Sequence, residues 1–239
     1  MDQRQAYEDY VCNMQGIYDK FPQREEDLRR LGTEAERMVK VREGCMALVF
    51  RHVDAINRTL ADYSVLIGEV VPAMVYQSSN IQTTILPFGI SDEYRYTDDQ
   101  APIVAALVQA AEEALRELDP SLVQSREIEF RRALFSRGVV LVPGYPNFAQ
   151  WVILNAIVEK VKTVPSLDQS KVRMPWGSQC VVARFAQDVS ASDLAELLSL
   201  IPYAPIIGIS RVTSIEVITN EVMPDGAQVT TTHARIPLP

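Results

Sequence analysis

The order of apolar segments after Pro72 constrains the fold of this chain more than any other feature. Strand-like and helical spacings alternate there, as they do in proteins whose helices cover β-sheets. The predicted strands span residues 73–77, 81–88, 128–134, 138–142, 179–185, 206–209, 213–219 and 229–236, and the predicted helices span residues 102–118, 148–164 and 191–201. A strand, a helix and a pair of strands thus occur twice, which indicates a loose internal duplication and an α/β (α+β) fold.

The first 70 residues carry a helical pattern instead. A short helix is predicted over residues 4–18, and a charged, helix-favouring stretch follows over residues 22–43. Apolar steps of three and four residues then predict one long amphipathic helix, with the stripe Cys45, Leu48, Val49, His52, Val53, Ile56, Leu60 and Tyr63. We therefore expect a helical extension, residues 1–70, and an α/β domain, residues 71–239, with the extension packed on the domain or serving a dimer.

Charge and composition exclude several classes of function. The formal net charge is −8, whereas binding of duplex nucleic acid normally needs a basic face that displaces counterions. Three scattered cysteines and only two histidines match no metal-ligand spacing, so no metal site and no cofactor is expected. The polar, acidic N-terminus is unlike a signal peptide, and no apolar run approaches the ~20 residues of a membrane span. These features predict a cytoplasmic protein with no membrane partner.

Two short segments carry a family resemblance. Asn80–Ile85, with the sequence NIQTTI, and Gly177–Phe185, with the sequence GSQCVVARF, resemble the two signature strands of the 2H phosphoesterases, the superfamily of LigT-like RNA ligases and cyclic phosphodiesterases. Residues 137–141 and 144–146 are similar to the strand and turn before that family's middle helix. The resemblance covers residues 73–238 and implies a LigT-like bilobal fold, in which two antiparallel-rich sheets face a central cleft with helices outside.

In this family each signature strand normally carries His-x-Thr or His-x-Ser. Alternate side chains of a strand share a face, so positions 82 and 84 point together, as do positions 179 and 181. The resemblance implies that one imidazole removes a proton from the nucleophile and the other protonates the leaving oxygen, while the hydroxyls hold the phosphate. Imidazole suits both proton transfers because it titrates near neutral pH.

The chain departs from this pattern at three of the four motif positions. Gln82 and Gln179 stand where the family has histidine, Val181 replaces the second hydroxyl, and only Thr84 matches. A carboxamide donates and accepts hydrogen bonds but exchanges no proton near neutral pH, so the ordinary 2H phosphodiesterase reaction is not expected. The catalytic positions are therefore degenerate, and the candidate ligand-binding side chains are Gln82, Thr84, Gln179 and Tyr145.

Each of these residues also has a plainer interpretation. Gln82 and Thr84 fit the polar face of a half-exposed strand, and Val181 is an ordinary strand residue. Tyr145 and Tyr76 either stack a nucleobase or pack in the core. The sequence leaves these alternatives open.

Other polar residues are interpreted more simply. Cys180 should face away from the cleft as a small buried side chain. Arg184 could bind an anion in the cleft, but its parity is opposite to that of Gln179, which favours pairing at the surface. His52 is expected to be a satisfied core or edge histidine, and His233 to lie on a polar strand face. A local basic group, either phosphate-binding or simply solvated, consists of Arg131, Arg132 and Arg137.

Three functions remain compatible with the sequence. The first is a diverged 2H-fold protein that binds a nucleotide or other phosphate ester in its cleft without the familial reaction. The second is an enzyme with repurposed chemistry in the same cleft, where preorganised hydrogen-bond donors orient another substrate. The third is an interaction or scaffold protein that works through its N-terminal helices, with a homo-oligomer as one form. Fold alone does not distinguish these functions.

Overall fold

The computed structural model describes residues 2–40, 43–92, 97–167, 172–223 and 227–239. Its α-helices are α1 (Gln3–Tyr18), α2 (Phe21–Leu31), α3 (Arg37–Lys40), α4 (Asp54–Val70), α5 (Ala101–Arg116), α6 (Pro120–Gln124), α7 (Phe148–Val161) and α8 (Ala195–Leu200). Its strands are β1 (Glu43–Arg51), β2 (Ala73–Val75), β3 (Thr83–Asp92), β4 (Ile128–Phe130), β5 (Leu134–Phe135), β6 (Val139–Val142), β7 (Gly144–Pro146), β8 (Cys180–Phe185), β9 (Gly208–Ser210), β10 (Ser214–Val222) and β11 (Gln228–Pro237).

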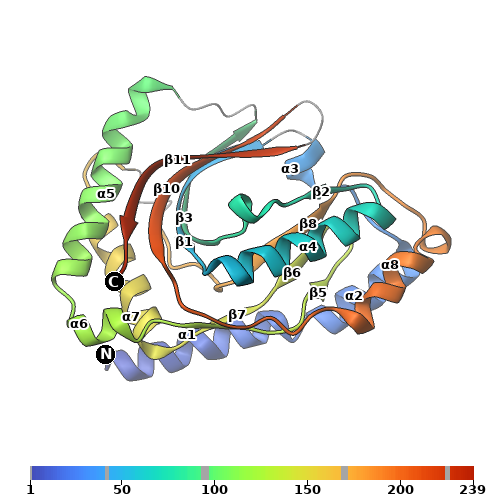
Figure 1. Cartoon of the computed structure of the whole chain (residues 1–239), viewed down its shortest axis with the longest axis horizontal. Coiled ribbons are helices and arrows are strands. Elements are labelled where there is room, and N and C mark those ends of the chain that lie inside the picture. The colour runs from blue at the N-terminus through green and yellow to red at the C-terminus, as the bar shows by residue number, and fades with distance from the viewer. Residues whose placement is uncertain (1, 41–42, 93–96, 168–171, 224–226) are drawn as a thin grey trace.

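The strands form three antiparallel sheets (Figure 1). The first sheet has the order β11-β10-β1-β3, and the second has the order β2-β8-β6-β5. A small third sheet, β7-β4-β9, joins the segment before α7 to the segment before β10. Every strand pairing among the described residues is antiparallel, so the expected α+β class with antiparallel-rich sheets is confirmed.

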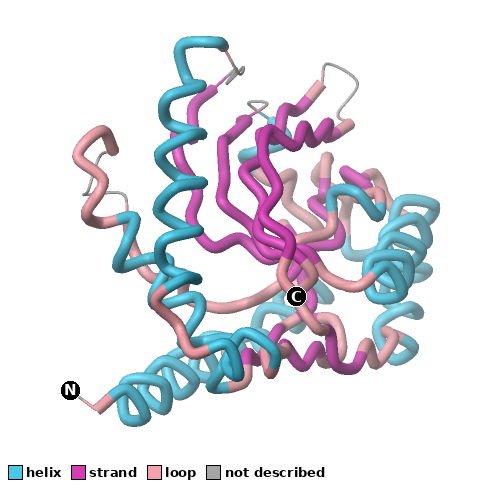
Figure 2. The backbone as a smooth tube through the Cα atoms, turned by 60° about the vertical axis from the view of Figure 1, so that its left-hand side comes forward, coloured by secondary structure: helices cyan, strands magenta, loops and turns pink. Residues whose placement is uncertain are grey.

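Helices cover the outer faces of the two larger sheets. α4 packs against β2 and β8 of the second sheet, and it buries Ile56, Leu60 and Ile67 there. α5 packs against β10 and β11 of the first sheet and against α7, and Figure 2 shows it running alongside the strands. Pro102 stands in the first turn of α5, where a missing backbone N–H costs nothing, as the sequence predicted. One continuous hydrophobic core joins these layers.

The prediction of one long helix over residues 45–63 is wrong for the first half of that segment. Residues 43–51 form β1, the strand between β3 and β10, and a helix begins only at Asp54. Both faces of β1 are covered, so Met46 through Phe50 are all buried. A continuous apolar run of this kind fits a buried strand and a helix equally well, and steps of three and four residues occur in it by chance.

This strand also moves the expected boundary between extension and domain. Because β1 pairs with β3 and β10, the helical extension ends before Glu43 rather than at residue 70. Within the charged stretch 22–43, α2 and α3 are helical, the residues between them are not, and residues 41 and 42 lie outside the described part of the chain. The sequence also missed β7, which it predicted as a turn.

The extension lies folded along the body. α1 packs on α7 and α2 on β5, and a small apolar cluster there contains Met14, Tyr18, Phe21 and Leu141. Beyond α2 the chain is tied by backbone bonds from Thr33 N–H to the Val189 carbonyl (2.9 Å) and from Glu36 N–H to the Phe185 carbonyl (2.9 Å). The extension is therefore part of the wall next to β8.

Candidate ligand-binding cleft

A cavity of about 590 Å³ lies between the first and second sheets. We call it the cleft. Gln82, directly before β3, and Thr84, within it, line the cleft from the first sheet. Gln179, directly before β8, and Val181, within it, line it from the second. The structure thus brings all four motif positions into one cavity. Its size is within the usual range for small-molecule sites, roughly 300–1,000 Å³.

The two motif strands touch where they begin. The Thr83 hydroxyl lies 3.6 Å from Cys180 Sγ and donates to the Ser178 carbonyl at 3.3 Å. Thr83 and Cys180 each stand one residue beyond a motif glutamine and point to the opposite face. The two strands therefore begin close together, and Gln82 and Gln179 line the same cavity.

Both motif strands carry a β-bulge at the same place. In β3 the pairing with β1 skips Ile85, and in β8 the pairing with β6 skips Val182. A bulge inserts one residue and so reverses the alternation of side chains beyond it. Three positions of each strand therefore line the cleft with the same spacing, namely 82, 84 and 87 in β3 and 179, 181 and 184 in β8. This shared spacing supports the internal duplication.

The bulge overturns the prediction for Arg184. Simple alternation places this side chain on the face opposite Gln179, but the extra residue Val182 returns it to the cleft wall. Its guanidinium pairs there with the Glu36 carboxylate at 3.2 Å and donates to the Tyr76 hydroxyl at 2.9 Å. Glu36 comes from the N-terminal extension, so this extension neutralises a cation of the cleft.

Three glutamine side chains of the cleft carry an oxygen without a hydrogen-bond donor among the described residues. The Oε1 atoms of Gln82, Gln179 and Gln228 are shielded from solvent and accept no hydrogen bond from this part of the chain. Gln82 and Gln228 are each only 9% exposed, and all three line the cleft. We call them the glutamine cluster. Buried polar atoms are nearly always hydrogen-bonded in folded proteins, so these three oxygens are the acceptors in the cleft wall to which a bound molecule or water could donate.

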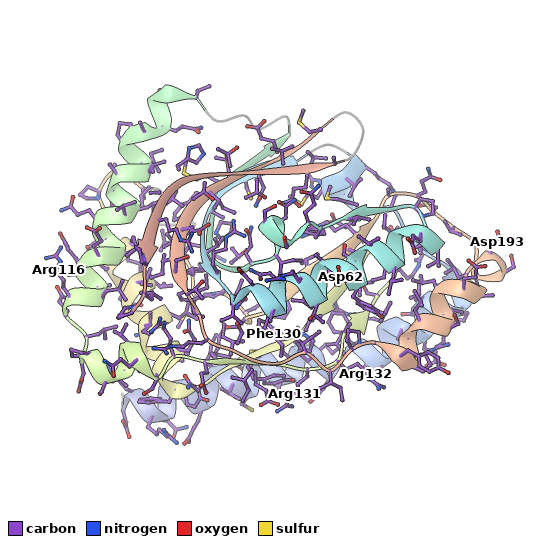
Figure 3. The ribbon with its side chains drawn as sticks, in the orientation of Figure 1. Asp62, Arg116, Phe130, Arg131, Arg132 and Asp193 are labelled. Atoms are coloured by element: carbon purple, nitrogen blue, oxygen red, sulfur yellow. The ribbon has the colours of Figure 1, made fainter. Side chains whose placement is uncertain are left out.

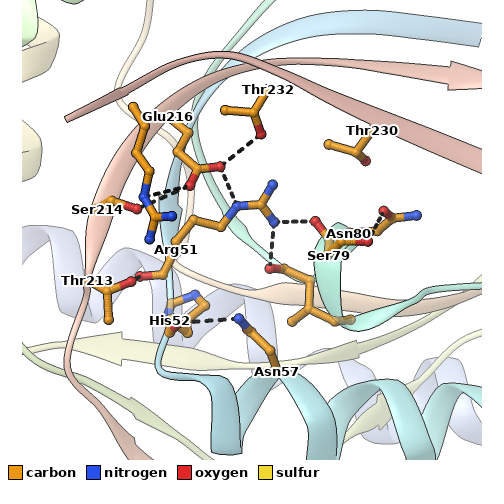
Figure 4. Close-up of polar contacts among 12 residues, drawn as sticks. Arg51, His52, Asn57, Ser79, Asn80, Thr213, Ser214, Glu216, Thr230 and Thr232 are labelled. Atoms are coloured by element: carbon orange, nitrogen blue, oxygen red, sulfur yellow. Dashed lines mark hydrogen bonds and ion pairs between the residues drawn. The ribbon is translucent and has the colours of Figure 1, made fainter. Parts of the chain in front are cut away.

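A polar network holds the segment that precedes Gln82 (Figure 4). Arg51 donates to the carbonyls of Ser79 (2.5 Å) and Ile81 (3.2 Å) and forms a buried ion pair with Glu216 at 2.7 Å. Asn80 then donates to the backbone carbonyl of Gln228 at 2.8 Å. These bonds link β1, β10 and β11 to the turn before β3, and they fix where Gln82 and Gln228 enter the cleft.

Tyr145 does not line the cleft, contrary to its selection as a ligand-binding residue. Its ring packs against Tyr18, with centroids 5.4 Å apart, and lies 3.9 Å from the Arg131 guanidinium carbon. Tyr76 lines the cleft but is 5% exposed, and burial raises the pKa of its phenol despite the nearby Arg184. Trp176, which the sequence did not single out, is the cleft residue with an exposed aromatic ring, 43% accessible.

Neither histidine lines the cleft. His52 is buried between the Ser210 hydroxyl (3.1 Å) and the Thr83 hydroxyl (3.0 Å), as the sequence predicted for a satisfied core histidine. Burial, helped by the charge of Arg51, lowers its pKa to about 3. His233 lies 2.9 Å from the Thr219 hydroxyl on β10.

The remaining candidates are structural. Cys180 is fully buried, and burial raises the pKa of its thiol to about 12, which agrees with its prediction as an inert core residue. The expected basic group lies outside the cleft lining, where Arg131 pairs with Glu129 at 3.2 Å and Arg137 with Glu34 at 3.3 Å. Figure 3 shows Arg131 and Arg132 on the side of the molecule that faces α1, away from the first sheet.

Comparison with solved structures gives a consistent result. The structure of TT0787 from Thermus thermophilus matches with a TM-score of 0.55 and 12% identity, over 81% of this chain and 97% of that chain. E. coli LigT complexed with ATP matches with a TM-score of 0.51 and 14% identity, over 82% of this chain and 98% of that chain. The chain has a LigT-like fold.

A third structure, described as a phosphoesterase, matches this LigT-like fold with a TM-score of 0.52 and 13% identity, over 82% of this chain and 98% of that chain. No protein-family model and no curated protein sequence matches the chain.

Across its described residues, no group of three or more histidine, cysteine or acidic side chains could hold a metal ion, and no helix is long and apolar enough to cross a bilayer.

Proposed function

We propose that this protein binds a nucleotide or related phosphate ester in the cleft and does not carry out the 2H phosphodiesterase reaction. The observation that carries the proposal is the glutamine cluster: two motif positions from different sheets, together with Gln228, present unpartnered carboxamide oxygens in one cavity of the described chain. The LigT structure complexed with ATP makes a nucleotide the first ligand class to test.

The lost reaction follows from the chemistry of the motif positions. The familial mechanism implied by the resemblance needs two groups that exchange protons near neutral pH, and loss of one such group typically costs ~10²- to 10⁴-fold in rate. Gln82 and Gln179 both lack this ability. His52 cannot replace them, because it is buried outside the cleft and its pKa is lowered to about 3.

Thermal unfolding with ATP and with 2′,3′-cyclic nucleotides tests the proposed binding. A nucleotide is expected to raise the melting temperature of the wild-type protein, and Gln82→Leu is expected to abolish that rise. Gln109→Leu, on the exposed face of α5, is the matched control and should behave like the wild type. Absence of stabilisation by every nucleotide, or full stabilisation of Gln82→Leu, would contradict the proposal.

A further inference from the structure

Resting on the proposed nucleotide binding, we infer that the glutamine cluster binds the uncharged hydrogen-bonding edge of the nucleobase and leaves the phosphates at the mouth of the cleft. A carboxamide presents a donor and an acceptor side by side, as the edge of a base does, and the two form paired hydrogen bonds. Three such groups come from Gln82, Gln179 and Gln228. The side-chain oxygen of each is shielded from solvent and accepts no hydrogen bond from a described residue.

The charges in the cleft favour an uncharged group at this place. Arg184 is the one cationic side chain among the described lining residues that is not exposed, and Glu36 takes up its charge at 3.2 Å. Arg173, the other lining arginine, is exposed at the rim. A phosphate placed among the glutamines would lose its hydration without gaining a counter-charge, which is strongly unfavourable.

The remaining surface of the cleft suits a flat, weakly polar ring. Pro87 and Val181 line it beside the glutamines, and Met174 and Trp176 line it on the loop before β8. The Trp176 ring packs on Tyr18 of α1 in a T-shaped arrangement, with centroids 5.8 Å apart. An exposed aromatic ring that lines a cavity and packs on a buried neighbour offers a face on which a base can stack.

Isothermal titration at constant ionic strength separates the base from the phosphate. The probes are adenosine, guanosine, cytidine and uridine, their 5′-monophosphates, ribose 5-phosphate and inorganic phosphate. We expect one nucleoside to bind within about threefold of its monophosphate, and ribose 5-phosphate and inorganic phosphate not to bind. Gln228→Leu should weaken the nucleoside at least tenfold, whereas Gln228→Asn, which keeps a carboxamide, should weaken it less.

The outcomes distinguish this inference from the function on which it rests. If the monophosphates and ribose 5-phosphate bind but no nucleoside binds, the inference is overturned. The proposed binding of a nucleotide or phosphate ester would then still stand. A protein that binds none of the probes would overturn the proposed function itself. Melting temperatures of both Gln228 variants verify that they fold.

Glu36→Gln gives an independent arm of the test. Removal of this carboxylate leaves the Arg184 guanidinium without its counter-charge in the cleft wall. The monophosphate should then bind several-fold more tightly relative to its nucleoside, and the gain should shrink as salt is added. An unchanged ratio would contradict the neutralisation on which the inference depends.

Discussion

Gln82 holds its carboxamide in the cleft wall with an oxygen that is shielded from solvent and accepts no hydrogen bond from the described residues. Such an atom costs about 1–3 kcal/mol of folding free energy, because it gives up water without receiving a partner. Residues that lower stability in this way are expected in binding sites, where a ligand supplies the missing hydrogen-bond donor. The glutamine cluster is therefore a stability cost that binding would offset.

The first prediction concerns the stability of the ligand-free protein. Gln82→Leu keeps the volume and removes the unpartnered amide, so the free energy of unfolding should stay the same or rise by ~1–2 kcal/mol. Thr83→Val is the contrasting control, because it removes a hydroxyl that is bonded to His52 and to the Ser178 carbonyl, and it should destabilise. Urea unfolding measures both. Equal losses in the two variants would show that the Gln82 amide is satisfied.

The second prediction concerns acid. The pKa of His52 is about 3 in the folded protein, against ~6.5 in an unfolded chain. As pH falls below ~6.5, the unfolded chain therefore binds a proton that the folded protein does not, and the free energy of unfolding decreases by up to ~1.4 kcal/mol per pH unit. Urea unfolding at pH 7 and pH 4.5 should show a loss in the wild type about 2 kcal/mol larger than in His52→Gln. Identical losses would contradict the neutral, buried imidazole.

At the residue scale the sequence anticipated part of the site. The positions of Gln82 and Gln179 followed from two short motifs, whose strands lie in different sheets as the resemblance implied. Arg184 was misplaced because a bulge cannot be read from alternation alone. Gln228 and Glu36 were missed because each reaches the cleft through tertiary packing, with no local pattern that marks it.

At the scale of elements, sequence patterns worked best where only one face of a segment is buried. Helix α5 and strand β11 each have a solvated side, and both were placed within a few residues. β1 was missed because both of its faces are covered and its apolar run therefore has no period. The pairing of β1 between β3 and β10 depends on contacts distant in sequence, which local patterns do not contain.

The third prediction tests how the elements around the cleft are joined. Arg51 and Glu216 form a buried ion pair at 2.7 Å, with side chains 10% and 6% exposed. Arg51→Met leaves the buried Glu216 carboxylate with the exposed Arg235, 3.4 Å away, as its remaining cationic partner, and it removes the donor to the Ser79 and Ile81 carbonyls. It should therefore lower the free energy of unfolding by about 3 kcal/mol, the lower end of the range for a broken buried pair. The exposed pair Arg29–Glu25 has the same distance, 2.7 Å, yet Arg29→Met should cost less than ~1 kcal/mol. Similar losses in both variants would refute the structural role given to Arg51.

At the scale of the whole molecule, the N-terminal extension belongs to the site. Glu36 and Met38 line the cleft, and α1 supports the loop that carries Trp176. Met14 and Phe21, which could have served a dimer, are buried against the chain's own body. Oligomerisation through these helices stays a prediction from the sequence, to be checked by solution scattering.

The fourth prediction uses two tyrosines of α1 that contact different tryptophans. Tyr18 packs on Trp176 and Tyr7 on Trp151, with centroids 5.8 Å apart in both pairs. Tyr18→Leu should shift the tryptophan emission to longer wavelength and weaken ligand binding, because Trp176 loses its support. Tyr7→Leu should change emission through Trp151 but leave binding unchanged. Equal effects on binding would show that α1 acts through general stability rather than through the cleft.

The most direct test of the central claim is an assay of 2′,3′-cyclic nucleotide hydrolysis. The claim is that Gln82 and Gln179 occupy the places of two proton-transferring groups in one cleft. The wild-type protein should show no turnover. The triple variant Gln82→His, Gln179→His, Val181→Thr removes two of the three carboxamides proposed to hold the base, so the phosphate can enter their place, and this variant should gain measurable hydrolysis. Turnover by the wild-type protein, or a triple variant that folds and stays inert, would contradict the account.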